Sequence, residues 1–257
     1  MNFFKNFLLE LQDITLLVSR AAIRLFTGKR YFAETFEQMD TIGVGSLTII
    51  LLTGFFTGGV LTLQSYPTFE SIGAQDRIGY ATAFALIREL GPVLTALMVT
   101  ARVGSAIAAE LGTMSVTQQI EAMRALGTDP IRKLVAPRII ALLTMLPILT
   151  VLADVIGLIG GAVVARTLFS FPLDGYYNSV RQGITVEDLL GGVIKPLVFG
   201  LLIGGIACHK GLTTEGGTVG VGRSTTSAVV LASIVVIIAD FFLARALQFV
   251  LGAQSSF

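Results

Sequence analysis

Hydrophobic positions along the chain fall into five long apolar runs that are separated by short polar segments. The runs cover residues 41–69, 78–111, 139–165, 189–208 and 224–252. A helix needs about 20 apolar residues to cross a bilayer, and each run reaches that length. The pattern therefore predicts an all-α integral membrane protein with five transmembrane helices.

Small residues recur four positions apart inside three of these runs. The pairs are Gly54 with Gly58, Gly157 with Gly161, and Gly200 with Gly204. Glycines at this spacing let two helix backbones approach closely, although glycine is also common in membrane helices in general. Both interpretations stay open at this point.

The segment 1–40, before the first run, has apolar residues at helical spacing. Phe4, Phe7, Leu8 and Leu11 recur on one side, and polar residues fill the other side. A stretch of this kind is too polar to span a bilayer and is typical of a helix that lies in the membrane interface. We therefore expect an N-terminal interfacial helix before the first span.

A polar, helix-favouring segment, residues 115–126, joins the second and third runs. Ser115 is a candidate N-cap, Gly127 ends the segment, and Asp129 with Pro130 begins a turn. Because this helix is tied directly to two spans, a soluble partner that pushes it would move both. It is a candidate coupling helix for an ATPase, and its candidate contact residues are Ser115, Gln118, Gln119, Glu121, Ala122, Arg124, Gly127 and Asp129.

Composition agrees with a membrane protein and excludes several functions. Of 257 residues, 53% are hydrophobic and 14% are charged, whereas a soluble domain carries about 25% charge. The net charge of +1 argues against nucleic acid as a partner. The single cysteine and single histidine do not favour a multi-ligand zinc site, and no catalytic triad or metalloprotease motif indicates an enzyme.

Lysine and arginine residues predict the orientation of the chain in the membrane. They gather after the second and fourth runs and in the first segment, which holds Lys5, Arg20, Arg24, Lys29 and Arg30. The loop after the first run has only Arg77. By the positive-inside rule, the N-terminus and the coupling helix are cytoplasmic and the C-terminus is periplasmic.

Charges inside the runs are candidates for function. Arg88 and Glu89 lie about ten residues into the second span and precede Gly91 and Pro92, which predict a kink. Charges at this depth are costly and usually face a cavity or a partner. The pair either lines a cavity or locks helices together.

Asp154 and Asp240 are single acids in the third and fifth spans. Two such acids could form the proton relay of an ion-coupled secondary carrier. They could equally pair with lysine or arginine from neighbouring helices, and the absence of a carboxylate cluster favours this structural role.

The stretch from Gly217 to Ser224 is one residue away from a nucleotide-binding P-loop, with Arg223 where lysine is required. A P-loop follows a strand and opens the helix of a soluble domain. Because this stretch lies between two spans, we expect a Gly/Thr-rich cytoplasmic loop over residues 209–223 instead, with Ser224 or Thr225 capping the fifth span.

Several longer motifs resemble the MlaE family of ABC transporter permeases, which serve MCE lipid-transport systems. They are Arg88-Glu-Leu-Gly-Pro-Val, Ala101-Arg-Val-Gly-Ser-Ala, Ala109-Glu-Leu-Gly-Thr-Met, Gln119-Ile-Glu-Ala-Met, Gly127-Thr-Asp-Pro and Ala136-Pro-Arg. The likeness covers nearly the whole chain and is weakest before about Asp40.

The resemblance implies a homodimer in the bacterial inner membrane, with cytoplasmic ATPase subunits that bind ATP and Mg and an MCE-domain protein on the periplasmic side. This chain would carry no cofactor and catalyse nothing itself. A phospholipid would occupy an outward-facing cavity lined by the first span and the outer part of the second. The lining candidates are Leu61, Gln64, Thr68, Phe69, Ile72, Arg88 and Glu89, with Val60 and Tyr66 as neighbours.

The sequence thus predicts a permease subunit that moves phospholipid to or from a periplasmic carrier. Two alternatives remain, which are the ion-coupled carrier that uses Asp154 and Asp240 and a membrane scaffold that transports nothing.

Overall fold

The computed structural model describes residues 2–26 and 31–252, and side chains for 9–21, 23 and 31–249. The side chains of Lys5, Arg24, Lys29 and Arg30, which support the expected orientation, lie outside this part. The α-helices are α1 (Asn2–Phe26), α2 (Phe32–Ser71), α3 (Ile78–Ala85), α4 (Gly91–Val99), α5 (Ser105–Val116), α6 (Gln119–Ala125), α7 (Ala136–Phe169), α8 (Leu173–Gly183), α9 (Val186–Leu212) and α10 (Gly217–Gly252).

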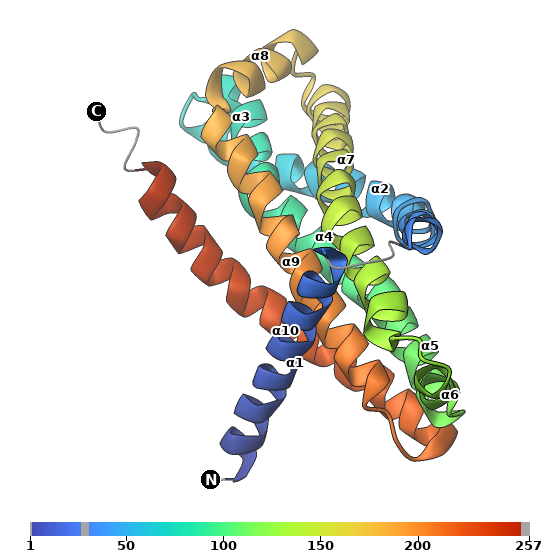
Figure 1. Ribbon diagram of the computed structural model, residues 1–257. Helices are drawn as coiled ribbons and strands as arrows, with labels where there is room; N and C mark the ends of the chain where they lie inside the picture. The colour runs from blue at the N-terminus through green and yellow to red at the C-terminus, as the bar shows by residue number, and fades with distance from the viewer. Residues whose placement is uncertain (1, 27–30, 253–257) are drawn as a thin grey trace. The chain divides into compact units, whose positions relative to one another are not determined.

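Five helical stretches within the described residues are long and apolar enough to cross a membrane. They are Phe32–Ser71, Gln75–Val116, Ile131–Phe169, Val186–Leu212 and Gly217–Phe249, and Figure 1 shows the long helices among them. The all-α prediction with five spans is confirmed. The helices extend past the apolar runs because flanking polar residues, such as Glu34 and Glu37 at the start of α2, also adopt helical geometry.

Two of the polar segments between the apolar runs contain helix. The connector between the third and fourth spans holds α8, which Figure 1 shows in light orange beside α3. The predicted loop over residues 209–223 is wrong, because α9 continues to Leu212 and α10 already begins at Gly217. Ser224 and Thr225 therefore lie within α10 and do not cap it. The P-loop-like stretch forms the first turns of α10 and follows α9 and a short loop, whereas a nucleotide-binding P-loop follows a strand.

The second span changes its helical geometry where a kink was expected. Three π-helices lie within the described residues: η2 (Leu86–Leu90) precedes α4, η3 (Thr100–Gly104) precedes α5, and η4 (Ile131–Val135) precedes α7. After η2 and η4, the next residue donates its N–H to the carbonyl five positions back, and a proline follows it. Because proline has no N–H to donate, the helix widens by one residue at these positions.

The chain divides into two compact units, to which the long helices each contribute segments. The first unit comprises Met1–Gly45, Val99–Met145 and Leu197–Ile238. In it, Ile14 of α1 is buried against Ile206 of α9 and Ala232 of α10.

Two ion pairs also join helices of the first unit. Glu10 of α1 pairs with Lys210 of α9, and Arg138 of α7 lies 2.7 Å from Glu110 of α5. The first ion pair and the buried Ile14 hold α1 against the segments of α9 and α10 that belong to this unit, and the second joins α5 to α7.

The second unit comprises Ser46–Met98, Leu146–Pro196 and Ala239–Phe257. Its α2 and α7 meet backbone to backbone: a methyl group on Gly54 would lie 2.6 Å from the Ala153 carbonyl oxygen, and one on Gly58 would overlap the carbonyl of Gly157. Of the two interpretations left open by the sequence, close packing therefore applies to Gly54 and Gly58.

An aromatic cluster lies toward the end of α2 in the same unit. The ring of Tyr66 stacks on Phe169 with centroids 4.0 Å apart, and both pack with Tyr176 of α8. This cluster and the glycine contacts position the segment of α2 that faces the candidate site.

Candidate functional site

Five charged side chains of the second unit form one cluster, which we call the charged cluster. The members are Arg88, Glu89, Asp188, Lys195 and Asp240, contributed by η2, α9 and α10. The guanidinium of Arg88 lies 3.4 Å from Asp188 and 4.8 Å from the ring centroid of Phe84. The cluster holds two cations and three carboxylates.

Lys195 is at the centre of the charged cluster. Its Nζ donates a hydrogen bond of 2.6 Å to Glu89 and one of 2.7 Å to the backbone carbonyl of Arg88. It also forms an ion pair with Asp240 at 2.9 Å. An ammonium group has three donors; two of them are used by these hydrogen bonds, and the ion pair adds a second carboxylate beside the charge. A lysine whose side chain is only 2% exposed needs such partners.

Exposure divides the charged cluster into a supporting part and an accessible part. The side chain of Asp188 is 8% exposed, whereas those of Arg88 and Glu89 are 32% and 45% exposed. Arg88 and Glu89 line a small hollow together with Glu187, Gly191, Lys195, Ala244 and Leu247. The accessible part offers a guanidinium that can bind an anion and a carboxylate that can accept from a cation.

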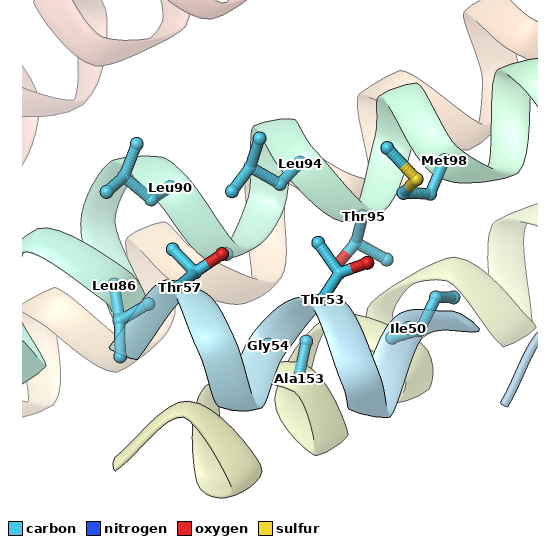
Figure 2. A pocket seen from close by; sticks show the side chains of 11 residues that line it. Ile50, Thr53, Gly54, Thr57, Leu86, Leu90, Leu94, Thr95, Met98 and Ala153 are labelled. Carbon is cyan, nitrogen blue, oxygen red and sulfur yellow. The ribbon is translucent and has the colours of Figure 1, made fainter. Parts of the chain in front are cut away.

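An apolar groove in the same unit lies along α2 and reaches η2 of the second span, and we call it the α2–η2 groove. Its lining residues are Leu52, Thr53, Phe56, Thr57, Val60, Leu61 and Leu90. A smaller hollow adjoins it, and Figure 2 shows Thr53 and Thr57 pointing from α2 toward Leu90 and Leu94. Leu90 directly follows Glu89 in the chain, so the groove begins one residue from the charged cluster.

The other predicted lining residues have different surroundings. Gln64 and Thr68 are exposed near the end of α2, and Ile72, just beyond it, is 70% exposed. Phe69 packs against the aromatic cluster that contains Tyr66 and Tyr176. The structure therefore brings Leu61 and Val60 into the groove and Arg88 and Glu89 into the charged cluster, but it does not gather all seven candidates into one hollow.

The candidate coupling segment belongs to the first unit. Helix α6 buries Ile120 and exposes Gln119, Glu121, Ala122 and Arg124. Gly127, with a φ of 75°, ends it, and the N–H of the next residue, Thr128, reaches back to the Met123 carbonyl. The Asp129 carboxylate accepts a hydrogen bond of 3.1 Å from the N–H of Ile131 and starts the following helix.

The sequence suggested Ser115 as the N-cap of this helix, but Ser115 does not cap it. It lies in the last turn of α5, and its hydroxyl donates to the carbonyls of Leu212 and Thr214 at 3.4 and 3.3 Å. The N-cap position of α6 is Gln118, which has a left-handed backbone with a φ of 60°. The helix therefore starts at Gln119, and Ser115 contacts the loop between α9 and α10.

Sequence reasoning did not assign Asp188 and Lys195 to the site. Their signal was present, since a charge inside an apolar helix needs a partner, and Lys195 stands in such a helix. The pairing of Asp240 with a basic residue of a neighbouring helix, which the sequence favoured, is present as an ion pair with Lys195. Asp154 does not join the cluster but packs against Gly91.

Comparison with known proteins gives a consistent assignment. Residues 35–246 match the family described as Permease MlaE. A probable ABC transporter permease protein of Rickettsia typhi is 42% identical over 84% of both chains, and one of Synechocystis is 44% identical over 88% of this chain and 86% of its own.

A chloroplast relative is also similar over most of the chain. The protein TRIGALACTOSYLDIACYLGLYCEROL 1 of Arabidopsis thaliana is 38% identical over 90% of this chain and 66% of its own length. The family match spans most of the sequence, including both candidate sites. The chain therefore belongs to the MlaE family of ABC transporter permeases.

Proposed function

We propose that this chain is the membrane subunit of a transporter that moves phospholipid between the bacterial inner membrane and a periplasmic MCE-protein carrier. The observation that carries the proposal is the α2–η2 groove next to the charged cluster, in a chain of the MlaE family. A relative named after a glycolipid supports a lipid substrate.

The chemistry of the site suits a two-part ligand. Exposed apolar side chains of α2, among them Phe56 and Val60, offer a surface for acyl chains. Arg88 can donate to a phosphate and Glu89 can accept from an ammonium group. Gln64, Thr68, Phe69 and Ile72 would contact the lipid nearer to the periplasmic end of α2.

ATP hydrolysis takes place, in this proposal, in a separate subunit that holds ATP and Mg. The exposed face of α6, with Glu121 and Arg124, contacts this ATPase. Two copies of the chain form the membrane core, as an ABC permease requires, with the N-terminus cytoplasmic and the C-terminus periplasmic. Motion of α6 would reach the second and third spans, since α6 joins them directly.

A reconstituted system tests this function. The full chain, purified from its native membrane with the proteins that accompany it, is placed in vesicles that contain a fluorescent phospholipid. We expect ATP-dependent transfer of this lipid to co-purifying carrier protein. The double variant Arg88→Gln/Glu89→Gln should lower transfer at least tenfold, because the loss of even one charged hydrogen bond, roughly 1.5–3 kcal/mol, corresponds to a factor of about ten or more.

The matched control replaces an acidic and a basic residue that follow one another in the sequence and lie outside the site. Asp76 and Arg77 are exposed after α2, and Asp76→Asn/Arg77→Gln should transfer lipid at the original rate. If lipid transfer does not depend on ATP but is abolished by an uncoupler, the proposal is wrong and the chain is an ion-coupled carrier. A preparation that shows neither transfer nor ATPase activity would leave only a scaffold.

A further inference from the structure

The turn that carries Arg88 and Glu89 lacks a backbone donor. In an α-helix the N–H of residue 92 would bond the carbonyl of Arg88, but residue 92 is a proline and has no N–H. The Nζ of Lys195 lies 2.7 Å from this carbonyl oxygen and donates to it. A lysine side chain from another helix thus occupies the position of the missing amide hydrogen.

The widened turn leaves a second carbonyl without its usual partner. The N–H of Gly91 bonds the carbonyl of Leu86, so it does not serve Ile87, which it would serve in an α-helix. The backbone of Gly192 lies against this Ile87 carbonyl, and a Cβ at position 192 would be 2.8 Å from the oxygen. Glycine at this position therefore lets α9 approach the turn closely.

One face of α9 meets all of these groups. Asp188, Gly192 and Lys195 are spaced at i, i+4 and i+7, which places them on one side of a helix. They contact, in order, the guanidinium of Arg88, the carbonyl of Ile87, and the carbonyl of Arg88 with the carboxylate of Glu89. The same α9 face therefore holds both the backbone and the side chains of the turn.

We propose that Lys195 is a positioning residue, whose ammonium group replaces the amide hydrogen that Pro92 lacks and so fixes the turn that presents Arg88 and Glu89. Lys195 itself is buried, and the accessible charges are those that it orients. The consequence for lipid transfer rests on the proposed function, but the geometry of the turn does not.

Restoring the missing donor in the backbone provides a specific test. We would compare the original chain with Lys195→Met, Pro92→Ala and the double variant, each as the full chain with its accompanying proteins in lipid nanodiscs. Hydrogen–deuterium exchange of a peptide spanning residues 86–94 is the measurement. Lys195→Met should speed this exchange several-fold, and Pro92→Ala in the same chain should reverse at least half of the change, since alanine supplies the N–H.

The control uses another proline within a membrane helix. Pro147 lies inside α7, and Pro147→Ala should not reverse the effect of Lys195→Met. Lys195→Met also leaves Glu89 and Asp240 without their cation, but this loss is common to the single and double variants. The rescue therefore reports on the restored backbone donor and not on the lost ion pairs.

Three outcomes would each overturn the proposal. They are unchanged hydrogen–deuterium exchange in Lys195→Met, no rescue by Pro92→Ala, and equal rescue by Pro147→Ala. If Lys195→Met does not accumulate in the membrane, the same pair of chains is made with Glu89→Gln and Asp240→Asn added, which leaves no unpaired carboxylate. Lipid transfer is measured in parallel. The expected exchange pattern with unaltered lipid transfer would sustain the role in the turn and refute the proposed role of the site in transport.

Discussion

Asp154 and Asp240 are both acids within apolar helices, yet their surroundings differ. Asp240 has Lys195 as a counter-ion. Asp154 is 7% exposed, and among the described residues its Oδ1 has no hydrogen-bond partner. This oxygen packs directly over the α-carbon of Gly91, so that any side chain at position 91 would overlap it. Gly91 is therefore needed for space as much as for the turn that follows η2.

A double-mutant cycle checks this contact. Gly91→Ala should lower the free energy of unfolding by about 1–3 kcal/mol, because the new methyl group overlaps the Asp154 carboxylate. Asp154→Ala makes room, so the double variant should lose clearly less than the sum of the two single variants. The measurement is unfolding by SDS titration in mixed micelles.

Gly104→Ala is the control, because the nearest atom to a methyl group there would be 3.6 Å away, an ordinary contact. Strict additivity of Gly91→Ala and Asp154→Ala would show that the two residues do not touch in the folded protein.

At the level of single elements, α6 shows what a short helix needs. It has only seven residues and is buried mainly through Ile120, so its position depends on the connections at both ends. The hydroxyl of Ser115 bonds the loop after α9 at one end, and Gly127 closes the other. Because both ends of α6 are held, its exposed face can transmit a force from a bound partner while the helix stays intact.

Reversal of one charge tests the proposed contact of α6 with an ATPase. Glu121 is exposed on α6, and Glu121→Lys should reduce the amount of co-purifying ATPase about tenfold, equivalent to ~1.4 kcal/mol of binding free energy, while the chain still inserts. Glu70→Lys makes the same change at an exposed position near the end of α2 and should leave co-purification intact. Equal ATPase recovery in both variants would exclude α6 as its docking site.

Elements and contacts differ in how well the sequence predicts them. The five spans follow from apolar length alone, but the start of α6 does not, because Gln118 adopts a left-handed backbone that its residue type does not favour. Arg88 and Glu89 are visible as charges in an apolar run. Their partners Asp188 and Lys195 are about 100 residues away in the chain. The pattern of apolar residues does not determine which residues of one helix lie opposite which residues of another.

For the whole molecule, we predict five membrane crossings, which would place the two ends of the chain on opposite sides of the membrane. The same topology would separate the loop after α2 from α6, since the second candidate span lies between them in the chain. Both positions offer exposed apolar side chains for labelling: Ile72 is 70% exposed and Leu126 is 83% exposed. Cys208, the single native cysteine, is buried.

Accessibility of introduced cysteines tests this topology and the predicted orientation together. In a Cys208→Ala chain in intact cells, Ile72→Cys should react with a membrane-impermeant maleimide. Leu126→Cys should react only after the inner membrane is opened. The reverse pattern would invert the orientation, and labelling of both positions from the same side would contradict a membrane crossing by the second span.

The length of α2 exceeds the thickness of a membrane. Its 40 residues extend about 60 Å at 1.5 Å per residue, whereas the hydrocarbon layer is about 30 Å thick. Even its uncharged stretch, residues 41–69, is about 43 Å long, so the helix must tilt, thicken the bilayer around it or project beyond it. Val60 and Leu63 remain exposed toward its far end. In the proposed function, an acyl chain that moves along this helix would still contact apolar side chains after it leaves the bilayer, so its path through water would be shorter.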